Sequence, residues 1–313
     1  MLMPQMTQDF IDTLKIDLQG ETGGTPSQYM TCLREADPDH FGLAAVDMDG
    51  KLYAAGDASE PFTLQSVGKV LLLNMVFREF GLDDTYARVN ADPIGGLGQF
   101  DQISLGRDGK AATPLVNTGA ITTAGMLWKA FGRRSYAKVH EAYRDFTGVE
   151  TTVDRDAMAE ELAIGHLNRA VAYFLRHHGL IEDPIDALEL YTFVCSLRTT
   201  ATHLATFAAT MANRGVNPVT GTKAASAHQM QHALMIMLLS GLYGGAGRAA
   251  VDNGLAAKSG ISGGLMAAVP NRFGFASFSP PLDRDGTSVR GLKACERLDD
   301  ELFVHVIDME TPR

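Results

Sequence analysis

The stretch GDASEPFTLQSVGK (56–69) decides the interpretation of the whole chain, because it ends in Ser66-Val67-Gly68-Lys69 just before a strongly apolar segment. At the start of a helix, a Ser-x-x-Lys spacing places both side chains on one face, one turn apart. The positive end of the helix dipole disfavours an ammonium there, so a buried Lys69 can lose its proton and act as base toward the Ser66 hydroxyl. Taken alone, the motif is more often a serine N-cap beside a solvated lysine.

A second motif, Lys258-Ser259-Gly260, strengthens the catalytic interpretation. Enzymes that activate a serine through Ser-x-x-Lys carry a Lys-Thr/Ser-Gly strand beside the nucleophile. Backbone N–H groups of that strand can form one half of an oxyanion hole, and the N–H of Ser66 can form the other half. The Ser-Asp-Asn or Tyr-x-Asn element of β-lactamases is absent from the sequence, so the chain is not simply a β-lactamase.

The apolar patterning places strands at both ends of the chain and helices between them. An N-terminal hairpin turns at Asp49-Gly50, an apolar helix covers 67–80 and ends at Gly81, and a C-terminal meander precedes a closing helix over 287–306. Further helices are predicted at 118–131, 135–147, 156–178, 186–196, 200–214 and 226–239, and strands at 41–48, 51–55, 255–258, 265–269 and 273–278.

This order predicts an α+β fold of the β-lactamase/transpeptidase-like type, with an antiparallel sheet assembled from both chain ends and an inserted all-helical part. We expect a single domain over 1–313. Its sheet subdomain would comprise 28–80 and 250–310, and its helical subdomain about 81–249.

The bulk composition excludes several classes of function. The 313 residues carry a formal net charge of −10, which repels phosphate backbones and argues against a nucleic-acid partner. Three sparse cysteines indicate reduced thiols rather than a disulfide framework. No signal-peptide pattern and no apolar run of bilayer length occur in the sequence, so we expect a cytoplasmic chain with no membrane partner.

Eight segments, in order along the chain and including the two motifs above, resemble the serine-dependent glutaminase family. The resemblance runs from about Tyr29 to Val306, and implies the fold described above and the hydrolysis of L-glutamine. The segments are GDASEPFTLQSVGK (56–69), PLVNTGAI (114–121), GHLNRAVAYFL (165–175), LYTFVCS (190–196), TMANRGVNPVTG (210–221), SGLY (240–243), GLAAKSGISGG (254–264) and SPPLDRDGTSVRG (279–291).

The resemblance implies catalytic roles for four residues and a substrate contact for Gln65, which precedes the serine. Ser66 matches the serine that is acylated, Lys69 its base, and Gln65 a glutamine that contacts the substrate. Tyr243 matches a pocket tyrosine suited to relay a proton with the Ser–Lys pair. Ile261 matches the residue whose backbone N–H completes the oxyanion hole, where the family usually has valine.

Five more residues match the family's substrate-binding groups. Tyr29 matches a tyrosine that closes over the substrate, and Tyr191 a second pocket tyrosine. Asn117 and Asn168 match asparagines that bind the α-carboxylate or nearby groups, and Glu161 matches the partner of the α-ammonium. Because Glu161 and Asn168 are seven residues apart, they would share one face of a single helix.

The resemblance further implies a homodimer or homotetramer and chemistry without a metal or organic cofactor. Departures from the family pattern occur at Ile94, Leu167 and Val194, where it usually has serine, arginine and glutamine. They leave open a related amidohydrolase that acts on a substituted γ-glutamyl amide.

Two alternatives belong to other classes. A non-catalytic ligand-binding homologue is disfavoured by the retained Ser66, Lys69 and Lys258-Ser259-Gly260. A metal protein is suggested by His228-x-x-x-His232, but without a third ligand nearby an exposed helix face is the simpler interpretation.

Overall fold

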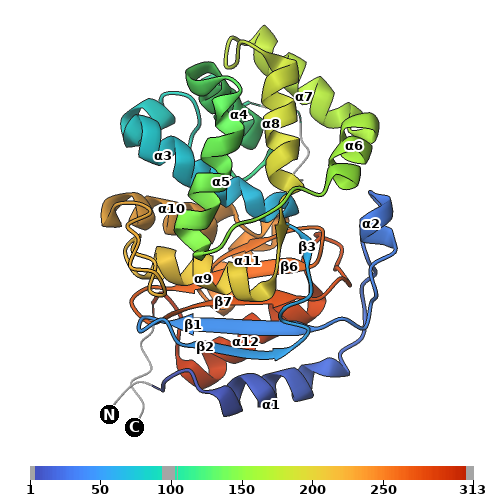
Figure 1. The fold of residues 1–313 in the computed structure, drawn as a ribbon, viewed down its shortest axis with the longest axis vertical. Coiled ribbons are helices and arrows are strands. Elements are labelled where there is room, and N and C mark those ends of the chain that lie inside the picture. Colours follow the sequence, from blue (N-terminus) through green and yellow to red (C-terminus); the bar gives the residue numbers. More distant parts are fainter. Residues whose placement is uncertain (1–3, 94–102, 104, 308–313) are drawn as a thin grey trace.

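The computed structural model describes residues 4–93, 103 and 105–307. Within them, five strands form an antiparallel sheet in the order β2-β1-β7-β6-β5 (Figure 1). Because β1 pairs with β7, the sheet joins the two ends of the chain, which confirms the predicted α+β fold. The strands are β1 (Gly42–Asp47), β2 (Leu52–Gly56), β5 (Ala256–Ser259), β6 (Gly264–Val269) and β7 (Phe273–Phe278).

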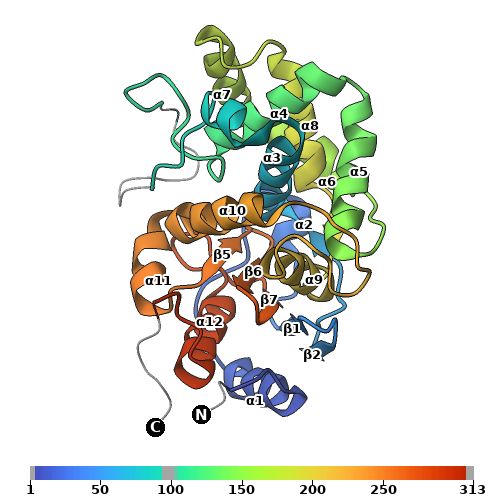
Figure 2. The same ribbon diagram turned by 90° about the vertical axis from the view of Figure 1, so that its left-hand side faces the viewer.

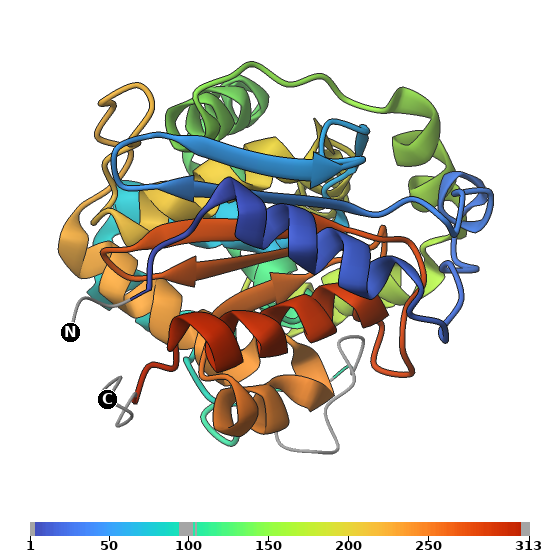
Figure 3. The same ribbon diagram turned by 90° about the horizontal axis from the view of Figure 1, so that it is seen from below.

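Side chains that alternate along the strands build a separate core on each face of the sheet. In β1, Ala44 and Val46 join the core beneath the helical region, whereas Leu43 and Ala45 join the core on the opposite face. Helix α9 (Ala201–Ala212) covers the first face, and α1 (Gln8–Gln19) with α12 (Val289–Leu302) covers the second (Figure 3).

A glycine permits the close approach of α9 to the sheet. A Cβ added to Gly274 of β7 would lie 2.0 Å from the backbone nitrogen of Ala209 in α9. No side chain fits that gap, so the helix backbone rests almost directly on the strand.

The remaining helices, apart from α11, lie above the sheet around α3, which is buried on nearly every side from Gly68 to Phe77 (Figure 2). A helix that is apolar all round belongs in the centre of a domain, as predicted. Gly81 adopts a φ of 79° and breaks α3, where the sequence predicts its end. The helices are α3 (Gly68–Tyr86), α4 (Asn117–Phe131), α5 (Arg134–Thr147), α6 (Arg155–Ile164), α7 (His166–His177), α8 (Pro184–Cys195), α10 (Ala227–Ser240) and α11 (Ala246–Asp252). Ala246, the first residue of α11, belongs instead to the core on the opposite face of the sheet.

Short elements complete the path of the chain. They are helix α2 (Thr31–Arg34), the strand pair β3 (Phe62–Thr63) and β4 (Arg198–Thr199), and the 3-10 turns η1 (Gln65–Val67) and η2 (Tyr243–Gly245). The closing helix α12 is shorter than predicted, because Phe303 turns left-handed with a φ of 51° and ends it.

The single helix predicted over 156–178 is wrong. The structure has two helices, α6 and α7, that meet at Gly165, whose ψ of 50° is not helical. A Cβ at Gly165 would approach the carbonyl oxygen of Glu161 to 2.6 Å, so the bend requires a glycine. Glu161 and Asn168 therefore occupy different helices rather than one face of a single helix.

Two helices lie against the sheet although the predicted sheet subdomain does not include them. Helix α9 falls within the predicted helical range, and α1 precedes residue 28. The division into subdomains stays a prediction. The helices that pack on the sheet come from more of the chain than the predicted sheet subdomain includes.

In the part of the chain that the structure describes, no single helix is both long and apolar enough to cross a bilayer. One pair, Ala227–Ser240 with Tyr243–Asp252, meets these criteria only jointly and is bent by 93° at its break.

Candidate active site

The candidate nucleophile and base lie where η1 passes into α3. Nζ of Lys69 donates a hydrogen bond of 2.6 Å to Oγ of Ser66. Lys69 is fully buried and Ser66 is 9% exposed. Loss of hydration lowers the pKa of Lys69 to about 8, and the charge of Glu161 acts in the opposite direction. A fraction of the molecules therefore holds Lys69 as a neutral amine near neutral pH, the form that a base requires.

A second fully buried lysine, Lys258, lies beside this pair. It shares the face of β5 that carries Ala256, which is the face below α3. Its Nζ donates to the carbonyl of Ser259 at 2.6 Å and lies 4.0 Å from the centroid of the Tyr243 ring. Burial, followed by the charge of Lys69, holds the pKa of Lys258 well below its usual range. From sequence, only the backbone of this motif has a predicted role.

Tyr243 stands between the two lysines and the serine. Its ring centroid lies 5.9 Å from Nζ of Lys69, and its hydroxyl is hydrogen-bonded to Ser66. Burial raises the pKa of Tyr243 above its usual value, and the hydrogen bond with Ser66 acts against that rise. The phenol thus keeps its proton at neutral pH in contact with the nucleophile.

The residue before Ser66 and the tyrosine that is hydrogen-bonded to it both have strained backbone conformations. Gln65 and Tyr243 adopt φ angles of 47° and 53°, in the left-handed region that residues other than glycine seldom occupy. Such conformations cost about 1–3 kcal/mol each and concentrate at functional sites. Gln65 is 2% exposed, and its Nε2 donates to Oγ1 of Thr63 at 3.3 Å.

The turn after β5 lies directly against η1, the turn that carries Ser66, here called the nucleophile turn. A Cβ on Gly260 would come within 3.0 Å of the Leu64 carbonyl oxygen and 3.5 Å of Cβ of Gln65. The N–H of Gly260 donates to the carbonyl of Gly264 at 2.8 Å, so it serves the turn itself. The next N–H, that of Ile261, remains the predicted partner of the Ser66 N–H in an oxyanion hole.

Three predicted substrate-binding residues form one hydrogen-bonded chain. Nδ2 of Asn117 donates to Oδ1 of Asn168 at 2.8 Å, and the Tyr191 hydroxyl donates to Oδ1 of Asn117 at 3.3 Å. All three side chains are buried, and Lys69 Nζ lies 5.4 Å from the centroid of the Tyr191 ring. The structure therefore places these three hydrogen-bonded side chains beside the Ser66–Lys69 pair.

Glu161 is the buried carboxylate of the site. It is 4% exposed, and its Oε2 has no hydrogen-bond partner among the described residues. Burial raises the pKa of Glu161 to about 7, and the charge of Lys69 lowers it in part. An unpaired, buried acceptor next to a nucleophile suits the α-ammonium of an amino acid.

Tyr29 is the most exposed of the predicted site residues, at 39%. Its hydroxyl lies 3.5 Å from the position that a Cβ on Gly165 would take, which places it over the bend between α6 and α7. Burial and then the Glu161 charge raise the pKa of Tyr29 to about 12. Although the break at Gly165 was not predicted, it places Tyr29 next to the last turn of α6, which carries Glu161.

Cys195 is a site neighbour without a predicted role. The thiol is buried at the end of α8, and it hydrogen-bonds with Tyr191, one turn earlier. Burial and then the Glu161 charge raise the pKa of Cys195 to about 12, so the thiol stays protonated. It is placed to orient the tyrosine rather than to react.

Two of the three departures from the family pattern lie within the described residues, in different surroundings. Leu167 is 42% exposed at the start of α7, so it does not face the site interior. Val194 is buried, and its Cγ1 lies 2.7 Å from where a Cβ on Gly68 would be, against the nucleophile turn. Ile94 lies outside the described residues.

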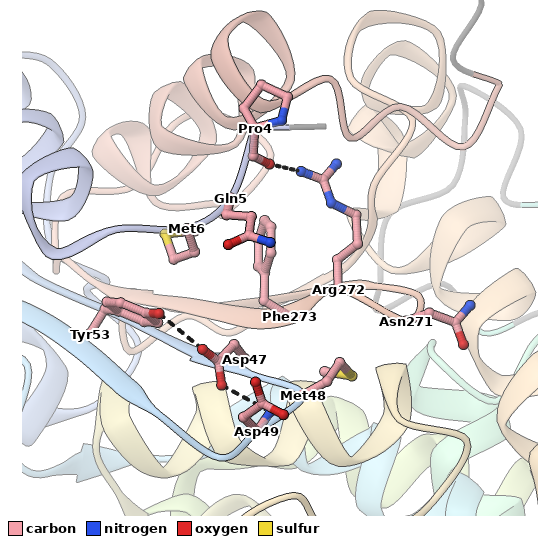
Figure 4. A pocket seen from close by; sticks show the side chains of 10 residues that line it. All are labelled: Pro4, Gln5, Met6, Asp47, Met48, Asp49, Tyr53, Asn271, Arg272 and Phe273. Atoms are coloured by element: carbon pink, nitrogen blue, oxygen red, sulfur yellow. Dashed lines mark hydrogen bonds between the residues drawn. The ribbon is translucent and has the colours of Figure 1, made fainter. Parts of the chain in front are cut away.

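A cavity of about 450 Å³ lies away from this site, beside the N-terminal segment and the β1–β2 turn (Figure 4). Its lining contains none of the predicted site residues. The Tyr53 hydroxyl donates to Asp47 at 2.9 Å, and Arg272 donates to the Pro4 carbonyl at 2.6 Å. These two contacts tie the cavity wall to the fold.

One histidine of the pair on α10 already has a protein partner. His232 Nδ1 lies 2.8 Å from the Tyr86 hydroxyl, in a partly buried contact. Across the residues that the structure covers, no group of three or more His, Cys, Asp or Glu side chains converges.

A serine and a lysine in contact at the start of the central helix, facing a Lys-Ser-Gly strand, define the serine β-lactamase-like fold class. Within this class the chain belongs to the glutaminase family, whose model, described as "Glutaminase", matches residues 24–307. Glutaminase 2 of Bradyrhizobium diazoefficiens is 38% identical over 300 residues, which are 96% of this chain and 48% of that protein. The chain spans about half the length of this relative and of Glutaminase 1 from the same organism, of which it covers 49%.

Two solved structures resemble the chain over nearly its whole length. The probable glutaminase ybaS is 32% identical with a TM-score of 0.91, over 96% of this chain and 97% of that one. Mglu in its glutamate form is 30% identical with a TM-score of 0.92, over 99% of this chain and 71% of that one.

Proposed function

We propose that the chain hydrolyses L-glutamine to L-glutamate and ammonia through an acyl-enzyme on Ser66. The observation that carries this proposal is the 2.6 Å contact between the buried Lys69 amine and the Ser66 hydroxyl. Membership of the glutaminase family supports glutamine as the substrate. The Mglu structure in its glutamate form adds support, because glutamate is the product that the reaction would release.

Substrate recognition follows from the charges of an α-amino acid. The buried Glu161 carboxylate would bind the α-ammonium, since an unpaired anion in a dry pocket gains most from a cation. Asn117 and Asn168 would bind the α-carboxylate and nearby groups through their amides. Tyr29 would then cover the bound substrate.

In the proposed acylation, Oγ of Ser66 bonds to the side-chain amide carbon while its proton passes to Nζ of Lys69. The former carbonyl oxygen becomes an oxyanion between the N–H groups of Ser66 and Ile261. The carbon–nitrogen bond then breaks, and the nitrogen takes a proton from Lys69, directly or through Tyr243, to leave as ammonia.

In the proposed deacylation, a water molecule attacks the γ-glutamyl ester while Lys69 takes one of its protons. The bond between the ester carbon and Oγ of Ser66 breaks, and Oγ recovers a proton from Lys69 or Tyr243. Glutamate leaves with the free enzyme restored. These steps balance without a metal or organic cofactor.

Release of ammonia and glutamate from L-glutamine by the purified protein tests the proposal, with N-alkylated glutamines as parallel substrates. Equal amounts of ammonia and glutamate from L-glutamine are expected. Turnover of N-alkylated glutamines alone would favour the substituted γ-glutamyl amide. Folded protein that acts on neither would contradict an enzymatic role and favour the non-catalytic alternative.

A homodimer or homotetramer in the cytoplasm, without nucleic-acid or membrane partners, completes the proposal. The family resemblance supports the oligomer, and the net charge of −10 disfavours nucleic acid. Light scattering on the eluted protein would measure the oligomeric state, and a monomer would contradict it.

A further inference from the structure

The segment that carries Tyr29 is fastened to α6 by one carboxylate. Both carboxylate oxygens of Glu160 accept the backbone N–H of Thr31, at 3.0 and 3.1 Å, and Oε1 also accepts the Thr31 hydroxyl at 2.8 Å. The two residues are 129 positions apart. Thr31 is the first residue of α2, whose N-cap Met30 makes no side-chain cap, so Glu160 satisfies a helix N–H that is otherwise unpaired.

The same contact joins three parts of the candidate site. Ala157, Glu160 and Glu161 lie three and four residues apart on α6, so they share one side of that helix. Ala157 packs with Met30 from the Tyr29 segment, and Ile261 packs against this small cluster. The element that carries Glu161 is therefore tied both to the segment bearing Tyr29 and to the predicted oxyanion residue.

The segment has a second attachment on the sheet side. Thr25 and Leu282 exchange two backbone hydrogen bonds, of 3.1 and 3.0 Å. Between the two attachments, Gln28 and Tyr29 are exposed. Residues 25–34, here called the strap, thus cross the site with one end on the sheet part and the other on α6.

We propose that Glu160 is a positioning residue, which acts through Thr31 to hold the strap, and with it Tyr29, over the bound amino acid. This inference rests on the proposed function of the site. The other site side chains are closed in, with Asn117, Glu161 and Asn168 each less than 10% exposed. In this proposal, the Glu160–Thr31 contact keeps the strap over these buried groups.

The kinetic test compares Glu160→Ala and Glu160→Gln with wild type, each also in a Tyr29→Ala background. Glu160→Ala is expected to raise KM for glutamine about tenfold, equivalent to about 1.4 kcal/mol, while kcat changes less than about twofold. Glu160→Gln keeps one acceptor oxygen and should raise KM less. With Tyr29 removed, Glu160→Ala should change KM by less than about twofold, because the strap then carries nothing to position.

Glu150→Ala is the matched control, since Glu150 pairs with Arg144 on the surface and should leave KM unchanged. An unchanged KM in Glu160→Ala, or the same rise with Tyr29 absent, would overturn the proposal. Amide hydrogen exchange at Thr31 requires no turnover. It therefore tests the positioning role of Glu160 separately from the proposed hydrolysis of glutamine. Faster exchange in Glu160→Ala supports the contact even if glutamine is not the substrate, whereas exchange at the wild-type rate contradicts it.

Discussion

The two sides of the candidate active site are built in different ways. Ser66, Lys69 and Lys258 come from the start of a buried helix and from a sheet strand, where core packing holds them and burial lowers the pKa of both amines. Glu161 and Tyr29 lie at a helix end and on a partly exposed strap. In the proposed reaction, the first side supplies the reacting groups and the second recognises the substrate. Substitutions should therefore lower kcat on the first side and raise KM on the second.

The largest effect is expected from Ser66→Ala, which removes the atom that forms the ester. The loss in kcat should be about 10⁴–10⁶-fold, as for nucleophiles elsewhere, with KM little changed. Steady-state ammonia release measures it. Ser226→Ala, at the N-cap of α10, is the control and should keep wild-type kcat. Activity within tenfold of wild type in Ser66→Ala would remove the distinction between the two sides.

Glu161→Gln, on the substrate-binding side of the site, should weaken the binding of glutamine. It keeps the shape of the side chain but removes the charge that faces the α-ammonium. KM should rise about 30-fold or more, equivalent to about 2 kcal/mol, the lower range for losing one partner of a buried charge pair. Initial rates over a range of glutamine concentrations separate KM from kcat. A fall in kcat at constant KM would place Glu161 with the reacting groups instead.

The pH dependence of kcat and of kcat/KM should report the titration of Lys69 on the first side and of Glu161 on the second. Lys69 must be neutral to accept a proton, and its pKa is lowered to about 8, so kcat should rise about tenfold per unit below that value and level off above it. Glu161 must be ionised, and its pKa is raised to about 7, so kcat/KM should also gain as pH passes through 7. A kcat that falls between pH 6 and 9 would contradict Lys69 as the base.

The smallest effect concerns the packing of the nucleophile turn. Gly68→Ala would place a methyl 2.7 Å from Cγ1 of Val194, and overpacking of this kind costs about 1–3 kcal/mol. Urea unfolding should show that loss, and Val194→Ala in the same chain should recover part of it. If Gly68→Ala unfolds at the wild-type urea concentration, the turn is looser than core packing implies.

Local features of the site could be predicted from the sequence, and long-range features could not. Ser66 and Lys69 meet because helical spacing alone brings them together, and the strands follow from alternation within each segment. The bend at Gly165 was missed because the amphipathic pattern continues through it, and one glycine costs a helix only about 1 kcal/mol. The sequence therefore predicts one continuous helix face for Glu161 and Asn168, whereas the structure places them on two helices that meet at Gly165.

Contacts between distant segments leave no periodic signal. The Glu160–Thr31 contact joins positions 129 apart, and either residue alone reads as an ordinary polar surface group. The packing of Val194 on Gly68 likewise depends on how α8 meets the nucleophile turn. The buried amine of Lys258 follows from the face of β5 that it occupies, which the register of the sheet determines.

The covalent ester on Ser66 is the central claim, and partitioning between water and hydroxylamine tests it most directly. L-glutamine and the γ-methyl ester of L-glutamate have different leaving groups but would give the same γ-glutamyl ester. At a fixed hydroxylamine concentration, both substrates should therefore give the same ratio of glutamate to γ-glutamyl hydroxamate. A ratio that changes with the leaving group would mean that water attacks the substrate directly, and would contradict the acyl-enzyme.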